Sequence, residues 1–182
     1  MKNSTYGLLG LAAMGLLSAC DSGQLPNDAT LSVMPESRSL IIEPNLQADG
    51  SCVIDPGNFV DMPFVLNLRA PNGSPIGDAD VSAFLDFAGN TSSGVPVLAL
   101  FEDRNGNGII DADTELVSNV DDDLAVVQTD DVSGDFTLLV RANTSCPFVG
   151  DLIVFSDGLL DTATIAITTQ PATPEVPEFP TP

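Results

Sequence analysis

The sequence predicts an all-β protein built as one antiparallel β-sandwich. Several segments alternate apolar and polar residues with a period of two, and turn-forming residues separate them. No stretch beyond the N-terminal region shows a helical period, apart from a turn or two expected at residues 113–120. The 163 residues that follow a predicted 19-residue leader suit a single hydrophobic core.

The expected strands follow one another along most of the chain. Alternation is clearest at residues 64–69, 81–87, 136–140 and 163–167. Further candidates are residues 30–33, 39–42, 95–101, 124–128 and 152–155. Eight to ten short strands with mostly polar outer faces, separated by turns such as Asn72-Gly73 and Asp157-Gly158, favour a sandwich over a closed barrel.

The first 19 residues have the features of a secretory signal peptide. Lys2 supplies a positive charge, and the apolar stretch at residues 7–17 is too short to span a bilayer. Leu17-Ser18-Ala19-Cys20 closely resembles the bacterial lipobox, which implies cleavage before Cys20 and a covalent lipid on its thiol. The alternative is an ordinary signal peptide with a cysteine at its cleavage site by chance.

The predicted location is extracytoplasmic, on a lipid anchor. Residues 20–29 are polar, with glycine and proline, and are expected to form a flexible tether. Asp21 directly follows the lipidated residue, as in the enterobacterial signal for retention in the inner membrane, a rule that other bacteria do not follow reliably. The domain therefore faces either the periplasm or the cell surface.

Composition excludes several classes of function. Beyond residue 19 the chain has four arginines against 26 acids, a net charge of −22, which disfavours nucleic acid as a partner and favours cations or basic proteins. The same region has no His, Lys, Trp or Tyr, so Ser-His-Asp, Schiff-base and His-ligated zinc chemistry are excluded. We expect no enzymatic activity; only a carboxylate-only hydrolase remains conceivable.

Two cysteines remain after Cys20 is assigned to the lipid. Cys52 and Cys146 are therefore expected to form a disulfide in an oxidising compartment. The alternative is a pair of buried free thiols.

The C-terminal residues 171–182 place prolines at intervals of three, the period of a polyproline II helix. This segment is expected to be a disordered tail, and the alternative is a docking segment or spacer.

Two stretches resemble the bacterial Ig-like domains of the invasin and intimin type. Residues 70–76 (Ala-Pro-Asn-Gly-Ser-Pro-Ile) and 79–84 (Ala-Asp-Val-Ser-Ala-Phe) are similar to the family's Asp-x-x-Gly-x-Pro-Val turn and Val-x-Phe strand. Residues 128–137 are similar to its Thr-Asp-x-x-Gly-x-Ala signature. The resemblance implies an Ig-like domain at residues 30–170, with an insertion at about residues 90–123, where the chain is longer than the family needs.

That insertion contains a calcium-type loop at residues 103–115. Ca²⁺ takes six to eight oxygens, and an Asp-x-Asn-x-Asn-Gly run supplies side-chain oxygens at alternate positions. The candidate ligands are Asp103, Asn105, Asn107, the Ile109 carbonyl, Asp111, and either Asp113 or Glu115. Residue twelve of the loop is Thr114, so the bidentate acid is displaced and weak structural binding is expected, at roughly 10⁻⁴ to 10⁻³ M. The alternative is a glycine-rich hairpin turn without metal.

Together these features predict a non-enzymatic, lipid-anchored Ig-like module of the cell envelope that serves adhesion or protein–protein interaction. A second hypothesis is an accessory lipoprotein of a pilus, secretion or conjugation assembly. On either hypothesis the expected partners are the membrane, through the lipid, and another envelope or surface protein.

Overall fold

The computed structural model describes residues 24–87, 98–111, 114–118 and 124–170, and within these ranges the chain forms ten β-strands and no helix. The strands are β1 (Thr30–Met34), β2 (Ser37–Ile42), β3 (Phe59–Arg69), β4 (Asp80–Phe87), β5 (Leu98–Asp103), β6 (Thr114–Ser118), β7 (Ala125–Gln128), β8 (Asp135–Asn143), β9 (Phe148–Ser156) and β10 (Leu159–Thr169). None of the described residues belongs to an apolar helix of membrane-spanning length.

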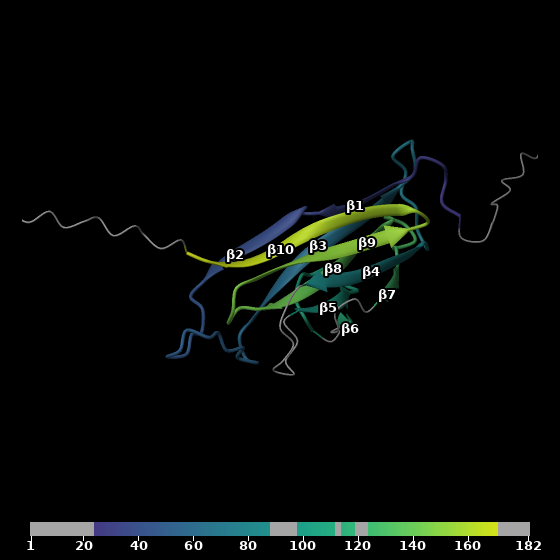
Figure 1. Ribbon diagram of the computed structural model, residues 1–182. Coiled ribbons are helices and arrows are strands. Elements are labelled where there is room, and N and C mark those ends of the chain that lie inside the picture. Colours follow the sequence, from purple (N-terminus) through teal and green to yellow (C-terminus); the bar gives the residue numbers. More distant parts are fainter. Residues whose placement is uncertain (1–23, 88–97, 112–113, 119–123, 171–182) are drawn as a thin grey trace, which may run out of the picture.

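The strands form two five-stranded sheets packed face to face (Figure 1). The first sheet has the order β1-β3-β8-β5-β6, and the second has the order β2-β10-β9-β4-β7. Without β2, β6 and β7, these are the ABED and CFG sheets of an immunoglobulin constant-type domain, with the strands in the same chain order. The predicted all-β Ig-like sandwich is confirmed.

One edge of the sandwich is formed by a segment that passes from one sheet to the other. β1 pairs antiparallel with β3, and after Pro35 and Glu36 the chain continues as β2, which pairs parallel with β10. The sequence predicted a purely antiparallel sandwich. The parallel pairing of β2 with β10 shows that this prediction is wrong for one strand pair. The chain runs in the same direction through β1 and β2. Its pairing changes from antiparallel with β3 to parallel with β10.

The helical turn expected at residues 113–120 is wrong, because Thr114–Ser118 is strand β6. It pairs antiparallel with β5, with Glu115 opposite Glu102 and Leu116 opposite Phe101. Val117 packs against the core from this strand. Ladder hydrogen bonds and the burial of Val117 outweigh the weak local preference for a helix.

The core lies between the sheets and follows the predicted alternation. In β4 the side chains of Val81, Ala83, Leu85 and Phe87 are buried, while the residues between them face outward. β5, which falls inside the expected insertion, contributes Leu98 and Leu100 to the same core and is thus a strand of the sandwich itself. The largest fully buried side chains include Phe64, Leu66, Leu68, Leu138, Leu152, Ile165 and Ile167.

The described chain begins and ends at opposite ends of the sandwich (Figure 1). Near its start, the Leu25 amide donates to Asp157 Oδ2 at 2.8 Å, which ties this segment to the β9–β10 turn. We call the end of the sandwich that holds Leu25 and the β9–β10 turn the start end. The other end holds the β8–β9 turn and the loop that follows β2, and we call it the disulfide end.

Arg141 organises the outer face of the first sheet and provides a test of this packing. It donates Nε to Asp61 Oδ1 at 2.7 Å and Nη2 to Asp61 Oδ2 at 2.9 Å, and it lies 5.6 Å from the ring centroids of both Phe59 and Phe101. Hydrogen bonding to Asp61 raises the pKa of Arg141, so the guanidinium stays charged at any working pH.

Replacement Arg141→Lys is expected to lower the free energy of unfolding by about 1 to 2 kcal/mol, because lysine keeps the charge but loses the bidentate pair and the stacking. This figure already allows for the partial exposure of the pair. Urea unfolding of the wild type and the variant measures this loss in the free energy of unfolding. Arg38→Lys is the matched control, since Arg38 makes a single exposed hydrogen bond to the Pro63 carbonyl. Equal small losses in both variants would contradict the role given to Arg141.

Candidate functional site

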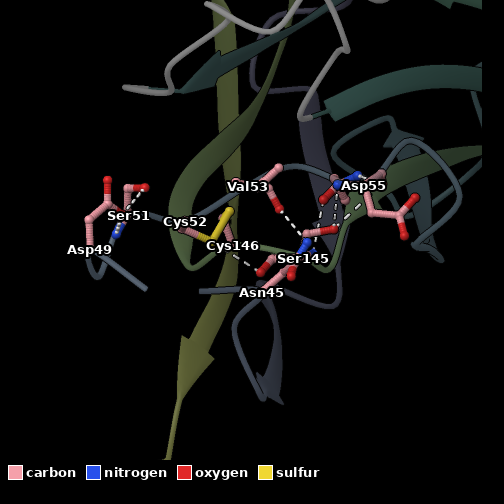
Figure 2. The surroundings of a disulfide bond; sticks show 9 residues. Asn45, Asp49, Ser51, Cys52, Val53, Asp55, Ser145 and Cys146 are labelled. Carbon is pink, nitrogen blue, oxygen red and sulfur yellow. Dashed lines mark hydrogen bonds between the residues drawn. A yellow bond between two sulfur atoms is a disulfide. The ribbon is translucent and has the colours of Figure 1, made fainter. Parts of the chain in front are cut away.

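The disulfide end is tied together by the predicted bond between Cys52 and Cys146 (Figure 2). The bond joins the loop after β2 to the turn between β8 and β9, with a Cα–Cα distance of 5.8 Å. Because the two cysteines are 94 residues apart, the bond closes more than half of the chain into one covalent loop.

Ser145, next to the disulfide, is the centre of a hydrogen-bond network that fixes the same loop (Figure 2). The Asn45 amide donates to the Ser145 carbonyl at 2.8 Å, and the Asp55 amide donates to Ser145 Oγ at 2.9 Å. Asn143 Nδ2 donates to the Asp55 carbonyl, and Asn143 Oδ1 accepts the Ser145 amide. Ser145 and Asn143 are almost fully buried, so the loop is held by buried polar contacts as well as by the covalent bond.

The calcium-type loop is the hairpin loop between β5 and β6. Asp103 is 3 % exposed, and its carboxylate accepts the amides of Gly106 at 3.0 Å and of Gly108 at 2.8 Å. Both glycines have positive φ, 66° and 76°, which a residue with a side chain seldom adopts. The loop folds onto the first sheet, where Gly108 approaches the Pro63 side chain.

The structure brings four of the candidate ligands into one turn. Asn107 Nδ2 lies 2.8 Å and Asn105 Nδ2 lies 3.3 Å from Asp111 Oδ2, and Asp103 lies at the base of the same loop. Glu115 is on β6, where it forms an ion pair with Arg104.

Asp113 lies outside the described residues, and the side chain of Ile109 is exposed. Within the described ranges, no three acidic, histidine or cysteine side chains are grouped as a metal site. Calcium binding therefore stays a prediction.

The start end carries two acidic surface cavities that sequence reasoning did not place. One, of about 620 Å³, is lined by Asp78, Asp80 and Asp157 together with Gln24 and Leu25, the first residues that the structure describes. The other, of about 430 Å³, lies beside the calcium-type loop and includes Asp103, Asp130 and Asp135. In each cavity one acid, Asp157 or Asp103, is far in sequence from the other two, so the sheet order brings it beside them.

In the second cavity, Asp130 is held in its charged form. Hydrogen bonds from the Ser133 amide, the Ser133 hydroxyl and the Val132 amide lower the pKa of Asp130. Asp135 forms an ion pair with Arg69 at 2.5 Å. A carboxylate-only hydrolase needs one acid with a raised pKa as its proton donor, whereas the pKa of Asp130 is lowered.

A cluster of apolar side chains on the outer face of the second sheet was also missed. Phe84 and Phe155 meet edge to face with ring centroids 6.3 Å apart, and Leu160 is 67 % exposed nearby. The sequence pattern predicts mostly polar outer faces. Phe84 lies between two inward-facing residues of its strand, so its ring faces outward. This residue was the sequence signal that the outer face is less polar than predicted.

Two predicted features lie outside the described residues. These are residues 1–23, with the signal peptide, Cys20 and Asp21, and the proline-rich residues 171–182.

Comparison with known proteins identifies no family for this chain. No family model matches, and no curated protein sequence matches. Among solved structures, a conjugative transposon lipoprotein from Bacteroides eggerthii is 12 % identical, with 78 % of this chain and 98 % of that chain covered and a TM-score of 0.40. AvmM, which catalyses macrocyclization in alchivemycin A biosynthesis, is 9 % identical, with 81 % and 93 % covered and a TM-score of 0.42.

The ASH/PapD-like domain 7 of human CEP192 is 9 % identical, with 95 % and 100 % covered and a TM-score of 0.36. Similarities at this level carry no argument about function, which has to be inferred from the chain's own residues.

Proposed function

We propose that this protein is a lipid-anchored, extracytoplasmic Ig-like module that binds another protein of the cell envelope. The observation that carries the proposal is the hydrogen bond from the Leu25 amide to Asp157. It attaches the first described residues to one end of a disulfide-tied sandwich. Three residues separate Cys20, the proposed lipid site, from Gln24, so the two Cα atoms are at most about 14 Å apart. The domain is thus held close to the membrane by its start end.

This geometry gives the molecule an orientation. The start end, with its acidic cavities, faces the membrane side, and the disulfide end points away from it. Leu46 and Val53 are exposed apolar residues on the loop at the disulfide end. A short tether and a rigid body suit a protein that presents fixed surfaces to a partner.

Affinity purification of the full-length chain from native membranes tests the proposal. We expect another envelope protein to be retained, and a fixed stoichiometry would favour the accessory-subunit hypothesis over an adhesin, which should be purified alone. Carbodiimide treatment of intact cells then detects a partner that dissociates in detergent, because it joins carboxylates to neighbouring amines. A chain that is purified alone and gives no adduct in cells contradicts binding to another protein of the same envelope.

The hairpin loop at residues 103–115 is proposed to bind Ca²⁺ and to stabilise the fold. The side chains of Asp103, Asn105, Asn107 and Asp111 lie in one turn, where both asparagine Nδ2 groups face Asp111 Oδ2. Each of the four side chains carries an oxygen, the donor type that Ca²⁺ prefers. The proposed set is completed by the Ile109 carbonyl and an acid at 113 or 115. Binding there would hold the loop against the first sheet.

Calcium is expected to raise the free energy of unfolding by about 1.4 to 2.7 kcal/mol at ten to a hundred times its dissociation constant, or several degrees in melting temperature. Thermal melting in Ca²⁺, Mg²⁺ and chelator measures the difference. Mg²⁺ should substitute poorly, since it requires tighter octahedral geometry.

The double replacement Asp103→Ala with Asp111→Ala should abolish the Ca²⁺-dependent shift, whatever its effect on basal stability. Asp131→Ala, an exposed acid outside the loop, should leave the shift intact. If chelator does not change the wild-type melting temperature, the loop is a hairpin turn without metal.

A further inference from the structure

The outer face of the second sheet is unusually apolar for a surface that no part of the described chain covers. Opposite one another across four strands lie Leu160, Phe155, Ser82 and Val126, and the neighbouring row holds Ile153 opposite Phe84. Leu160 is 67 % exposed and Val126 is 59 % exposed. We define the aromatic patch as Phe84, Val126, Ile153, Phe155 and Leu160.

The aromatic patch is separate from the core. The core side chains of these strands, such as Val81, Leu85 and Val154, alternate with the patch residues and point to the other side of the sheet. Phe84, Ile153 and Phe155 are not among the partly buried residues that pack against the core. These half-buried side chains therefore contribute little to the sandwich itself. Exposed apolar clusters with aromatic residues are typical of binding surfaces.

The patch is bordered by negative charge. Asp80 and Asp86 on β4 and Asp151 on β9 lie on the same outer face, above and below the apolar rows. Ser82 and Phe155 also line the 620 Å³ cavity, which holds Asp78, Asp80 and Asp157. An apolar surface thus leads directly into an acidic cavity at the start end.

Within the described ranges, no positive side chain pairs with these acids. Arg69, Arg104 and Arg141 form ion pairs with acids elsewhere in the fold. Arg38 is in β2 of the same sheet, but it lies opposite the core residue Ile165 and donates to the Pro63 carbonyl of the other sheet. The chain's lysine, Lys2, lies in the signal peptide.

We infer that the aromatic patch and its acidic cavity bind a protein surface with an apolar centre and a lysine- or arginine-bearing rim. Charge complementarity selects this occupant, because a second copy of the chain would bring the same acids against each other, and anionic lipids would be repelled. An apolar centre with a charged rim is also the usual anatomy of a protein interface. The inference deepens the proposed function, on which it rests, by stating the chemistry of the partner.

Carbodiimide coupling in intact cells, with adducts mapped by mass spectrometry, tests this inference. The mature chain has no lysine and its N-terminal amine is proposed to be acylated, so copies of the chain cannot couple to one another. We expect adducts between lysines of one partner protein and Asp80, Asp86, Asp151 or Asp157, with a yield that falls as salt rises. Replacement Leu160→Asp or Val126→Asp should reduce the yield about tenfold, the loss expected for a hot-spot side chain.

The matched control is Val132→Asp, at an exposed turn residue outside the patch, which should leave the yield unchanged. Adducts confined to other acids, such as Asp49 at the disulfide end, would overturn the inference and leave the proposed function intact. Adducts with phosphatidylethanolamine would assign the patch to the bilayer and also overturn it. The absence of any adduct, together with purification of the chain alone, would contradict the proposed function as well.

Discussion

Removing the disulfide lowers the free energy of unfolding by about 4 to 5 kcal/mol on the chain-entropy model. Cys52 and Cys146 close a loop with a sequence separation of 94, and the bond restricts the unfolded chain in proportion to the logarithm of that length. A domain of this size has a total stability of only about 5 to 15 kcal/mol. The double replacement Cys52→Ala with Cys146→Ala should therefore be close to unfolding at 37 °C.

Urea unfolding of the wild type with and without reducing agent, beside the double variant, measures this effect. Reduction should destabilise the wild type and leave the double variant unchanged, which separates loss of the covalent bond from general effects of the reagent. Asp49→Ala is a control in the same loop, where the Asp49 carboxylate accepts the Ser51 amide and hydroxyl without joining the two segments. Wild-type protein that is indifferent to reduction would show that the hydrogen bonds around Ser145 suffice to hold the loop.

Replacement Cys20→Ala is expected to abolish membrane attachment completely. Two or three acyl chains, at about 0.8 kcal/mol per buried methylene, form an anchor that is stable on cellular timescales. The region beyond residue 19 has a net charge of −22 and is repelled by anionic lipids, so we expect it not to replace the lipid anchor. Fractionation of cells into membrane and soluble pools measures the result.

The wild type should remain with the membrane in high salt and leave it only in detergent, since the attachment is apolar. Asp21→Ser is the matched control and should keep the protein in a membrane fraction. A Cys20→Ala chain that is processed by signal cleavage but still sediments with membranes would show that another part of the protein holds it there.

Much of the fold could be predicted because each strand leaves a local pattern. Val81, Ala83, Leu85 and Phe87 alternate in sequence and are buried in the structure, and the same holds for Phe64, Leu66 and Leu68. β6 could not be found in this way, because its strand state depends on pairing with β5 and on the burial of Val117. The passage of the β1–β2 segment between sheets likewise depends on partners far along the chain.

The candidate sites were predicted unevenly for a similar reason. The disulfide followed from counting cysteines, and the loop at residues 103–115 followed from a contiguous motif. The aromatic patch combines β4, β7, β9 and β10, and the acidic cavity combines three loops, so neither has a contiguous signature. Sites that depend on the order of strands in a sheet become visible only once that order is known.

Mass spectrometry of the protein purified from native membranes under non-reducing conditions tests the central claim of a lipid-anchored, extracytoplasmic domain. The account predicts a chain that begins at Cys20 and carries diacylglycerol and an acyl group, together with a peptide that links Cys52 to Cys146. A chain that retains residues 1–19 or bears an unmodified Cys20, with free alkylatable thiols at positions 52 and 146, would contradict both the anchor and the compartment.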